Sequence, residues 1–258
     1  MQQMRISIIG LEGFPLVEVG DDLAKMIVET ARQNAVSIED GDILVVAQKV
    51  VSKAEGRVVR LRDVEPSERA RSMAKEAFKD PRFVELVLRE VKKVLKVSPE
   101  TLMVENEKGL VCINAGLDKS NVSGWDAYAL LPRDPDESAE RIRSRILELA
   151  GKRVAVVISD TYSRPFRRGQ VEFAIGIAGI NPFKDYRGRG DLFNYKLKVK
   201  NIAIVDEIAS AAELVMGQAE EAVPVAIVRN LNLVEPSDSF SIEDLNISRE
   251  EDLFRGTL

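Results

Sequence analysis

The side chains best suited to chemistry follow an apolar run at residues 154–158. Three of them carry oxygen and three are arginines: Asp160, Thr161, Ser163, Arg164, Arg167 and Arg168. Carboxylate and hydroxyl oxygens are the ligands that Mg²⁺ and similar hard cations prefer, and a guanidinium binds phosphate or carboxylate through two parallel hydrogen bonds. A strand that ends in these groups predicts a metal-assisted site for an anionic substrate. The alternative is a solvated, salt-bridged turn.

A second segment, residues 109–124, offers a partner for this site. It begins as a short apolar strand and continues with the Gly, Asn and Ser residues that are typical of a loop. Asp118 and Asn121 lie in that loop. Two strand-to-loop junctions that each carry an aspartate are what a shared divalent cation needs, so Asp118 and Asp160 are predicted metal ligands. The alternative for Asp118 is an Asx-turn, which is a purely local structure.

Composition excludes several other kinds of chemistry. The 258 residues contain no histidine and one cysteine, Cys112, which excludes serine–histidine catalysis, histidine-ligated zinc and an intrachain disulfide. The net charge of −5 argues against general nucleic-acid binding, because neutralised phosphates supply most of the non-specific affinity. The N-terminal apolar run is too short for a signal peptide or a membrane span, and a single thiol fits a reducing compartment. A cytoplasmic protein is expected.

The apolar periods predict helices and strands without regular βαβ alternation. We therefore expect an α+β fold with mixed sheets and packed helices. Strands are expected at residues 5–9, 42–47, 101–105, 110–114, 154–158, 198–205 and 223–229. Helices are expected at residues 21–35, capped by Asp21 or Asp22, and at 66–78, 81–95, 136–150 and 207–217, with a stop and restart at Asp80–Pro81. The strands at 101–105 and 110–114 are expected to form a hairpin. No repeat or linker divides the chain, so residues 1–258 are expected to form one domain or two closely packed subdomains. The irregular stretch at residues 179–196 predicts a substrate loop.

A nucleotide would have to bind through an unusual geometry. The chain has neither GxxxxGK[ST] nor G-x-G-x-x-G after a strand, so neither a P-loop nor a Rossmann fold is expected. Gln48, Lys49 and Lys53 follow the apolar run at residues 42–47. The lysines could contact phosphate, and Gln48 could contact a base or a phosphate. The alternative is an exposed turn with solvated lysines. The Gly-containing loop at residues 10–15 is a weaker candidate.

Four segments together resemble the coenzyme F420-0:γ-glutamyl ligases. They read AQKVVSKAEGR (residues 47–57), GLDKSNV (116–122), ISDTYSRPFRRGQVEFAIGIAG (158–179) and VMGQAEEAVPVAIVR (215–229). The resemblance extends over nearly the whole chain, and it is closest to the single-domain archaeal form. It implies a GTP-dependent ligase that joins L-glutamate to the deazaflavin precursor coenzyme F420-0 and then adds a γ-linked glutamate. It also implies an unusual α+β fold and an intertwined homodimer.

The resemblance further implies which residues bind which ligand. Two Mg²⁺ or Mn²⁺ ions and K⁺ are implied, with Asp118 and Asp160 as metal ligands and with Thr161 and Gln218 at a second ion. The residues implied to contact GTP are Gly10, Leu11, Glu12, Gly13, Phe14, Lys49, Lys53, Asn121, Met216, Gly217, Gln218, Ala219, Glu220, Glu221, Ala222 and Val223. Because an amide is a weak ligand for a hard cation, Glu220 or Glu221 could share the metal with Gln218. The alternative for this acidic pair is an ordinary helix end.

The chemistry of the residues agrees with a ligase. A carboxylate must be activated before it forms an amide, and an acyl phosphate made with GTP would do this. Cations and arginines would stabilise the crowded negative charge. Arg164, Arg167 and Arg168 are expected to bind the anionic acceptor or the incoming glutamate. Two alternatives remain: a metal-dependent nucleotide phosphohydrolase, and a non-catalytic module whose basic residues 184–200 bind RNA or another anion, although that stretch has few aromatics for stacking on bases.

Overall fold

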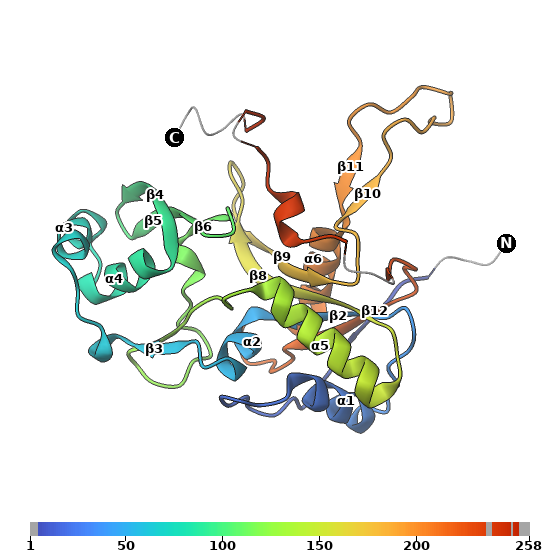
Figure 1. The fold of residues 1–258 in the computed structure, drawn as a ribbon, viewed down its shortest axis with the longest axis horizontal. Helices are drawn as coiled ribbons and strands as arrows, with labels where there is room; N and C mark the ends of the chain where they lie inside the picture. Colours follow the sequence, from blue (N-terminus) through green and yellow to red (C-terminus); the bar gives the residue numbers. More distant parts are fainter. Residues whose placement is uncertain (1–4, 236–238, 249, 253–258) are drawn as a thin grey trace. The chain divides into compact units, whose positions relative to one another are not determined.

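A computed structural model describes residues 5–235, 239–248 and 250–252 (Figure 1). It confirms a mixed α and β structure with several sheets. The first four residues of the N-terminal run discussed above lie outside the described part. The chain divides into two compact units. Unit 1 comprises Met1–Val17, Asp21–Val51 and Asp134–Leu245; unit 2 comprises Glu18–Gly20, Ser52–Arg133 and Asn246–Leu258.

Unit 1 contains a five-stranded sheet in the order β1–β12–β2–β8–β9. Its strands are β1 (Ser7–Gly10), β12 (Val225–Arg229), β2 (Ile43–Ala47), β8 (Ala155–Ser163) and β9 (Gln170–Ala178). β2 and β8 run parallel, and the other neighbouring strands run antiparallel. The first four residues of β2, ILVV, are fully buried. Such a continuous apolar run is typical of a strand that is covered on both faces.

Helices of unit 1 pack on this sheet and on one another. They are α1 (Leu23–Gln33), α5 (Pro135–Ala150) and α6 (Ile204–Met216). A shorter helix, α2 (Gln48–Ala54), starts directly after β2, and its residues from Ser52 onward belong to unit 2. Ala209 and Ala212 of α6 are buried in one apolar cluster with Val45 and Val157 of the sheet. The other long helix, α5, packs against β8 and β9, and α1 lies alongside α5 (Figure 1). The approach of α5 to β9 requires a glycine, because a Cβ on Gly176 would lie 2.4 Å from the Cβ of Pro135.

The ends of these helices follow local sequence signals. Asp22 caps α1, as predicted, by accepting a hydrogen bond from the N–H of Lys25 at 3.0 Å. Asp134 caps α5 in the same way, with Pro135 at the first helical position. Gly151 ends α5 in the left-handed conformation, with φ of 66°. The helix predicted at residues 136–150 is thereby confirmed within one residue.

Unit 2 contains two smaller sheets and two helices. One sheet has the order β4 (Val91–Ser98), β5 (Thr101–Asn106) and β6 (Val111–Ile113), and β3 (Val58–Arg60) pairs with β7 (Ala127–Ala129). The helices are α3 (Glu68–Ala77) and α4 (Pro81–Arg89). Short 3₁₀ turns occur at Leu61–Asp63 and Asn114–Gly116, and another lies in unit 1 at Ile242–Leu245. The predicted hairpin over residues 101–114 is confirmed as β5 and β6.

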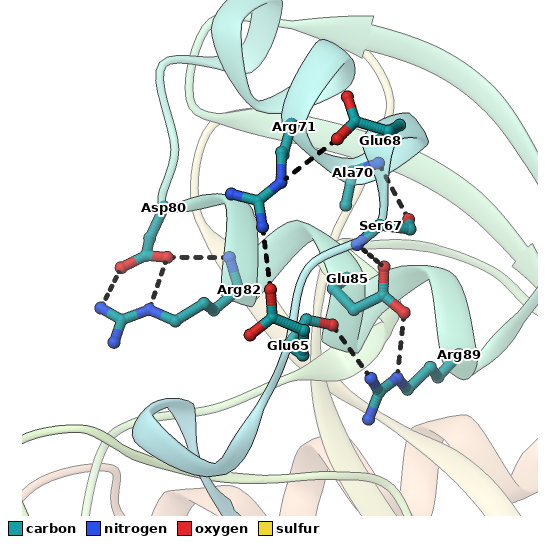
Figure 2. Close-up of polar contacts among 9 residues, drawn as sticks. All are labelled: Glu65, Ser67, Glu68, Ala70, Arg71, Asp80, Arg82, Glu85 and Arg89. Carbon is teal, nitrogen blue, oxygen red and sulfur yellow. Dashed lines mark hydrogen bonds and ion pairs between the residues drawn. The ribbon is translucent and has the colours of Figure 1, made fainter.

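Hydrogen bonds between side chains and backbone fix α3 and α4 (Figure 2). Ser67 caps α3, and its own N–H donates to Glu85 of α4 at 2.9 Å. Hydrogen bonds from Ser67 lower the pKa of the Glu85 carboxyl. Asp80 caps α4 and also binds the guanidinium of Arg82, which lowers the pKa of Asp80. The predicted stop and restart at Asp80–Pro81 is confirmed.

The helix predicted at residues 81–95 ends early, at Arg89, and residues 91–98 form β4 instead. Val91, Val94 and Val97 are three residues apart, which resembles a helical period. In the structure, two register shifts in the pairing with β5 account for this spacing. Each bulge adds one residue to the strand, so an apolar spacing of two becomes three. The helical prediction was wrong because a bulged strand can imitate a helix.

Other predicted boundaries also differ. The strand predicted at residues 154–158 continues to Ser163, so Asp160 and Thr161 lie inside β8 and not after it. Residues 48–54, for which an exposed turn was the alternative, form the helix α2. The strand predicted at 198–205 is limited to β11 (Asn201–Ala203), which pairs with β10 (Phe183–Asp185), and α6 already begins at Ile204. Sheet pairing decides the bounds of β8 and β11, and a single strand's composition does not reveal that pairing.

Candidate functional site at one edge of the unit 1 sheet

Strand ends bring most predicted site residues of unit 1 to one edge of its sheet. Gly10, the last residue of β1, pairs with Ala226 near the start of β12, and Ala47, the last residue of β2, pairs with Ser159 of β8. Asp160 and Thr161 follow Ser159 along β8. Neighbouring strands lie about 4.8 Å apart, so the residues at this edge extend over about 15 Å from β1 to β8.

The loop after β1 and the segment after α6 are neighbours at this edge. The N–H of Leu11 donates to the carbonyl of Val225 at 2.9 Å, and the N–H of Ala47 donates to Pro224 at 2.9 Å. A Cβ on Gly10 would lie 2.8 Å from Cγ1 of Val223, so the close approach depends on glycine. Two segments predicted to contact nucleotide, residues 10–14 and 216–223, are therefore brought together. Their binding role stays a prediction.

The residues after β2 also start at this edge. Gln48 is buried at the first position of α2, and Lys49 follows it with a half-buried side chain. Lys53 lies one turn further along α2, also half-buried, at a position that belongs to unit 2. A spacing of four residues places Lys49 and Lys53 on the same face of the helix. The alternative of an exposed turn with two solvated lysines is therefore wrong. Gln48, which was predicted to contact a base or a phosphate, has a buried side chain.

Thr161, Glu172 and Gln218 form a hydrogen-bonded cluster at this edge. Thr161 Oγ1 lies 2.8 Å from Glu172 Oε1 and 3.2 Å from Gln218 Oε1. The Gln218 amide nitrogen donates to the same Glu172 oxygen at 2.9 Å. The structure thus brings together two residues that were predicted to share a metal ion. Their oxygens, with one carboxylate beside them, are donors that suit a hard cation.

Glu172 is the member of this cluster that the sequence prediction missed. Residues 170–178 were not assigned to a strand, whereas they form β9 and pair with β8 in an antiparallel hairpin. Thr161 and Glu172 are directly opposite in this register, so their side chains lie on the same face. Two apolar runs on either side of the turn sequence RPFRRG were the available signal. A hairpin prediction for residues 155–178 would have placed Glu172 beside Thr161.

The two carboxylates predicted to assist Gln218 lie in the segment that follows α6. Glu220 and Glu221 are exposed in the turn that follows α6, so they are not part of a helix end. Glu221 accepts a hydrogen bond from the N–H of Ala219 at 2.7 Å. Hydrogen bonds from the backbone N–H groups of Glu221 and Ala219 lower the pKa of the Glu221 carboxyl. The carboxylate that contacts Gln218 is Glu172 of β9.

The three arginines lie at the tip of the β8–β9 hairpin. Nη2 of Arg164 donates to the carbonyl of Arg168 at 3.5 Å, and its Nε is buried without a hydrogen-bond partner within the described residues. Arg167 and Arg168 are exposed. Within residues 5–235, 239–248 and 250–252, none of the three forms an ion pair with a carboxylate. The three arginines therefore take no part in a salt-bridged turn, and the tip presents unneutralised positive charge.

Asp118 and Asn121 belong to unit 2. One Asp118 oxygen accepts the N–H of Ser120 at 2.7 Å, which is the Asx-turn considered as an alternative. The backbone N–H and carbonyl of Asp118 both form hydrogen bonds with the backbone of Ala129. Asn121 adopts a left-handed conformation, with φ of 55°. Metal-bound carboxylates commonly carry such hydrogen bonds, so the turn is compatible with a ligand role. The pairing of Asp118 with Asp160, which belongs to unit 1, stays a prediction.

Residues 186–200 form an extended arm between β10 and β11 of unit 1 (Figure 1). Arg187 pairs with Asp185 at 2.7 Å, and Lys184 and Arg189 lie over the ring of Tyr186. The predicted irregular loop at residues 179–196 is thus partly a β-hairpin. Its role as a substrate segment stays a prediction.

Two further properties limit the kinds of site in the described part of the chain. No three His, Cys, Asp or Glu side chains come together there as a metal-binding group. No helix within the same residues is long and apolar enough to cross a membrane.

Comparison with known proteins identifies the class. The sequence profile of the F420-0:Gamma-glutamyl ligase family matches residues 13–230, and the chain belongs to this family. It is similar to the coenzyme F420:L-glutamate ligase of Archaeoglobus fulgidus, with 47% identity over 99% of this chain and 98% of that protein. It is also similar to those of Methanothermobacter thermautotrophicus, with 44% identity over 98% of this chain and 100% of that protein, and Methanocaldococcus jannaschii, with 42% identity over 98% of each.

Proposed function

We propose that this chain is a coenzyme F420-0:L-glutamate ligase that uses GTP and a divalent metal. The family and the names of its relatives support ligation of glutamate to this acceptor. The observation that supports the proposal most is that the predicted site residues of unit 1 gather at one edge of its sheet. Residues 10–14 and 216–223, the cluster of Thr161, Glu172 and Gln218, and the start of α2 lie there together.

The metal ligands would be Asp118, Asp160, Thr161 and Gln218. The oxygen donors of the last two are brought together, and oxygen donors suit Mg²⁺ or Mn²⁺. When bound, such ions neutralise the charge that develops during phosphoryl transfer. A monovalent K⁺ is part of the same proposal.

The nucleotide would bind along the sheet edge, where residues 10–14 and 216–223 are neighbours. Lys49 and Lys53 would supply positive charge for its phosphates, and Asn121 would supply a polar contact. The arginines at the hairpin tip would bind the carboxylates of the incoming glutamate or the phosphodiester of the acceptor. Their lack of ion pairs within the described residues supports this role, because no internal carboxylate competes for them.

The proposed reaction has two steps. The acceptor carboxylate oxygen attacks the γ-phosphorus of GTP, the bond between that phosphorus and the bridging oxygen breaks, and GDP leaves. The amine of glutamate then attacks the acyl-phosphate carbon, the amide bond forms, and inorganic phosphate leaves as the nitrogen loses a proton. The chain contains no histidine to assist. Electrostatic stabilisation by cations and arginines is accordingly the main protein contribution.

A product assay tests this proposal. The full chain would be incubated with GTP and Mn²⁺, with and without coenzyme F420-0 and L-glutamate, and the products would be read by mass spectrometry. We expect GDP only when both substrates are present, together with a deazaflavin that is heavier by one or two glutamyl units. GDP without the substrates would indicate a phosphohydrolase, and ATP serving as well as GTP would overturn the nucleotide preference.

We also propose that the protein is a cytoplasmic homodimer formed through the arm. Leu192 is 97% exposed and Phe193 is 89% exposed at the tip of the arm, with Tyr195 and Val199 also exposed nearby. Several large exposed apolar side chains on one short hairpin are typical of a contact surface. A second copy of the chain would cover them.

Light scattering after size exclusion tests the arm. We expect a dimer for the wild type and a monomer for the double variant Leu192→Ser/Phe193→Ser. Leu16→Ser is the matched control, because Leu16 is equally exposed but lies outside the arm. A monomeric wild type, or a double variant that stays dimeric, would overturn this proposal.

A further inference from the structure

We propose that Glu172 is a positioning residue for the metal site. Its carboxylate holds the amide of Gln218 and the hydroxyl of Thr161 so that the oxygens of both side chains turn toward the same cation. The inference rests on the proposed function, because it explains how two neutral side chains given a metal role there become effective ligands.

The hydrogen bonds determine which atom of each side chain faces the cation. Glu172 Oε1 accepts from the Gln218 amide nitrogen at 2.9 Å and from the Thr161 hydroxyl at 2.8 Å. Because the amide nitrogen of Gln218 donates to Glu172, the amide oxygen of Gln218 must point away from the Glu172 carboxylate. Thr161 has one hydroxyl hydrogen, and it donates this hydrogen to Glu172, which is the closer of its two partners. The lone pairs of the Thr161 oxygen therefore remain available beside the Gln218 oxygen.

The separation of the two oxygens fits neighbouring ligands of one ion. Thr161 Oγ1 and Gln218 Oε1 lie 3.2 Å apart. Adjacent oxygens of an octahedral Mg²⁺ site, with metal–oxygen distances of about 2.1 Å, are about 3 Å apart. Without Glu172, the Gln218 amide could rotate by half a turn and present its nitrogen, which cannot bind a cation.

Glu172 is itself held firmly. Its side chain is buried with 6% exposure, whereas Gln218 is exposed. The backbone carbonyl of Glu172 accepts the hydroxyl of Ser210 on α6 at 2.6 Å, and the N–H of Ala174, two residues along β9, donates to Asp206 of α6 at 3.0 Å. An exposed glutamine loses rotamer freedom when it is ordered, and a fixed carboxylate lets it bind a cation without that additional loss.

Direct metal binding tests the role of Glu172. The full chain would be titrated with Mn²⁺, alone and with GDP, and free Mn²⁺ would be measured by electron paramagnetic resonance. Glu172→Ala is expected to weaken Mn²⁺ binding by about 10–100-fold, which is typical for loss of a group that orients a ligand. Glu172→Gln is expected to keep the affinity within about threefold, because its side-chain oxygen still accepts the same hydrogen bonds.

Two further variants separate positioning from structure. Ser210→Ala removes one of the hydrogen bonds that hold the Glu172 backbone and leaves the carboxylate in place, so it should weaken Mn²⁺ binding much less than Glu172→Ala does. If Glu172 acts through Gln218, the double variant Glu172→Ala/Gln218→Ala should lose less affinity than the sum of the two single losses. Circular dichroism of every variant checks the fold.

The outcomes are distinct. Wild-type affinity in Glu172→Ala, or fully additive losses in the double variant, would overturn the positioning role and leave the proposed ligase untouched. Equal losses in Glu172→Ala and Glu172→Gln would also overturn it, because the negative charge itself would then bind the metal. Wild-type protein that binds no Mn²⁺ in either condition would overturn the metal part of the proposed function and this inference with it.

Discussion

The hydroxyl oxygen of Thr161 lies 3.2 Å from the side-chain oxygen of Gln218, although 57 positions separate them in the sequence. Thr161 is fixed by its place in β8, and Gln218 comes two residues after α6, which packs on the same sheet. The packing of α6 therefore brings the segment at residues 216–223 to the edge where Asp160 and the loop after β1 also lie. The predictions below test this arrangement.

Loss of the Asp160 charge should stop turnover without unfolding the protein. Asp160→Asn keeps the size of the side chain and removes the charge proposed to bind metal. Activity is expected to fall by about 10²–10³-fold, which is typical when one electrostatic contact at a reacting group is lost. Steady-state GDP release measures this, and thermal unfolding measures the fold. A variant with near-normal ligation rates would remove Asp160 from the site. Asp63→Asn, at an exposed aspartate outside every predicted site segment, is the matched control.

The contact between Gly10 and Val223 should be needed for nucleotide binding. In Gly10→Ala, the new Cβ would lie 2.8 Å from Cγ1 of Val223, so residues 10–14 and 216–223 must move apart. Overpacking of this kind costs about 1–3 kcal/mol, and we expect GTP affinity, measured by calorimetry, to fall with it. Adding Val223→Ala removes the clashing atom and should restore part of the affinity.

Gly13→Ala serves as the control for this experiment. Gly13 has a φ of +69°, but nothing lies within 4 Å of an added Cβ. The substitution Gly13→Ala therefore strains the backbone of the same loop and creates no new side-chain contact. If Gly10→Ala binds GTP as well as the wild type, or if Gly13→Ala weakens binding equally, the close approach of the two segments is not what the nucleotide requires.

The sequence predicted the elements of this fold better than their pairing. The cap of α1 could be narrowed to Asp21 or Asp22 because capping depends on a few neighbouring residues, and Asp22 is the cap. The end of β8 could not be located, because Asp160 and Thr161 are polar and a polar residue usually ends a buried strand. They remain in β8 because β9 pairs with it as far as Gln170. Such long-range pairing leaves little trace in the strand's own composition.

The same limit applies to the candidate site. Thr161 and Gln218 were placed together by resemblance, and the structure brings them together. Glu172 was missed because its position depends on the register of β8 against β9. The Asx-turn at Asp118 was predictable as an alternative, since Ser120 is only two residues away. Local geometry and the hairpin of β5 and β6 could be inferred from sequence, whereas the pairing of β8 with β9 was not predicted.

The carboxyl of Asp206 should make stability depend on pH in an unusual direction. Burial raises the pKa of Asp206 above its ordinary value of 3.8, although the N–H of Ala174 donates to it and lowers the pKa in part. An acid whose pKa is raised by folding destabilises the folded state once it ionises. Below the ordinary value both states are protonated and the penalty is absent. As pH rises through the raised folded pKa, the penalty develops and then stays constant.

Asp206→Asn removes this ionisation and keeps an oxygen for the N–H of Ala174. We expect the variant to be more stable than the wild type at pH 8 and the difference to shrink at pH 4, as measured by urea unfolding at both pH values. Glu207→Gln, an exposed neighbour on the same turn, controls for loss of one charge near the start of α6. A difference that does not change with pH would contradict the prediction.

The ion pair between Arg229 and Asp42 should be one of the main polar contributions to the stability of unit 1. Arg229, the last residue of β12, donates to both oxygens of Asp42, at 2.7 and 2.8 Å, and to the Ser37 carbonyl at 2.7 Å. Asp42 is 1% exposed. The hydrogen bond to Asp42 raises the pKa of Arg229, so the guanidinium stays protonated.

Removal of Arg229 should therefore leave the buried carboxylate of Asp42 without its cationic partner. Arg229→Ala is expected to lower the free energy of unfolding by about 3 kcal/mol, at the low end for a broken buried pair because the N–H of Glu39 still donates to Asp42. Arg229→Ala/Asp42→Asn should be more stable than Arg229→Ala, since no buried charge is left. Arg145→Ala, which breaks the partly exposed pair with Asp22, should cost less than about 1 kcal/mol. Equal losses in Arg229→Ala and Arg145→Ala would show that burial of Asp42 does not decide the cost.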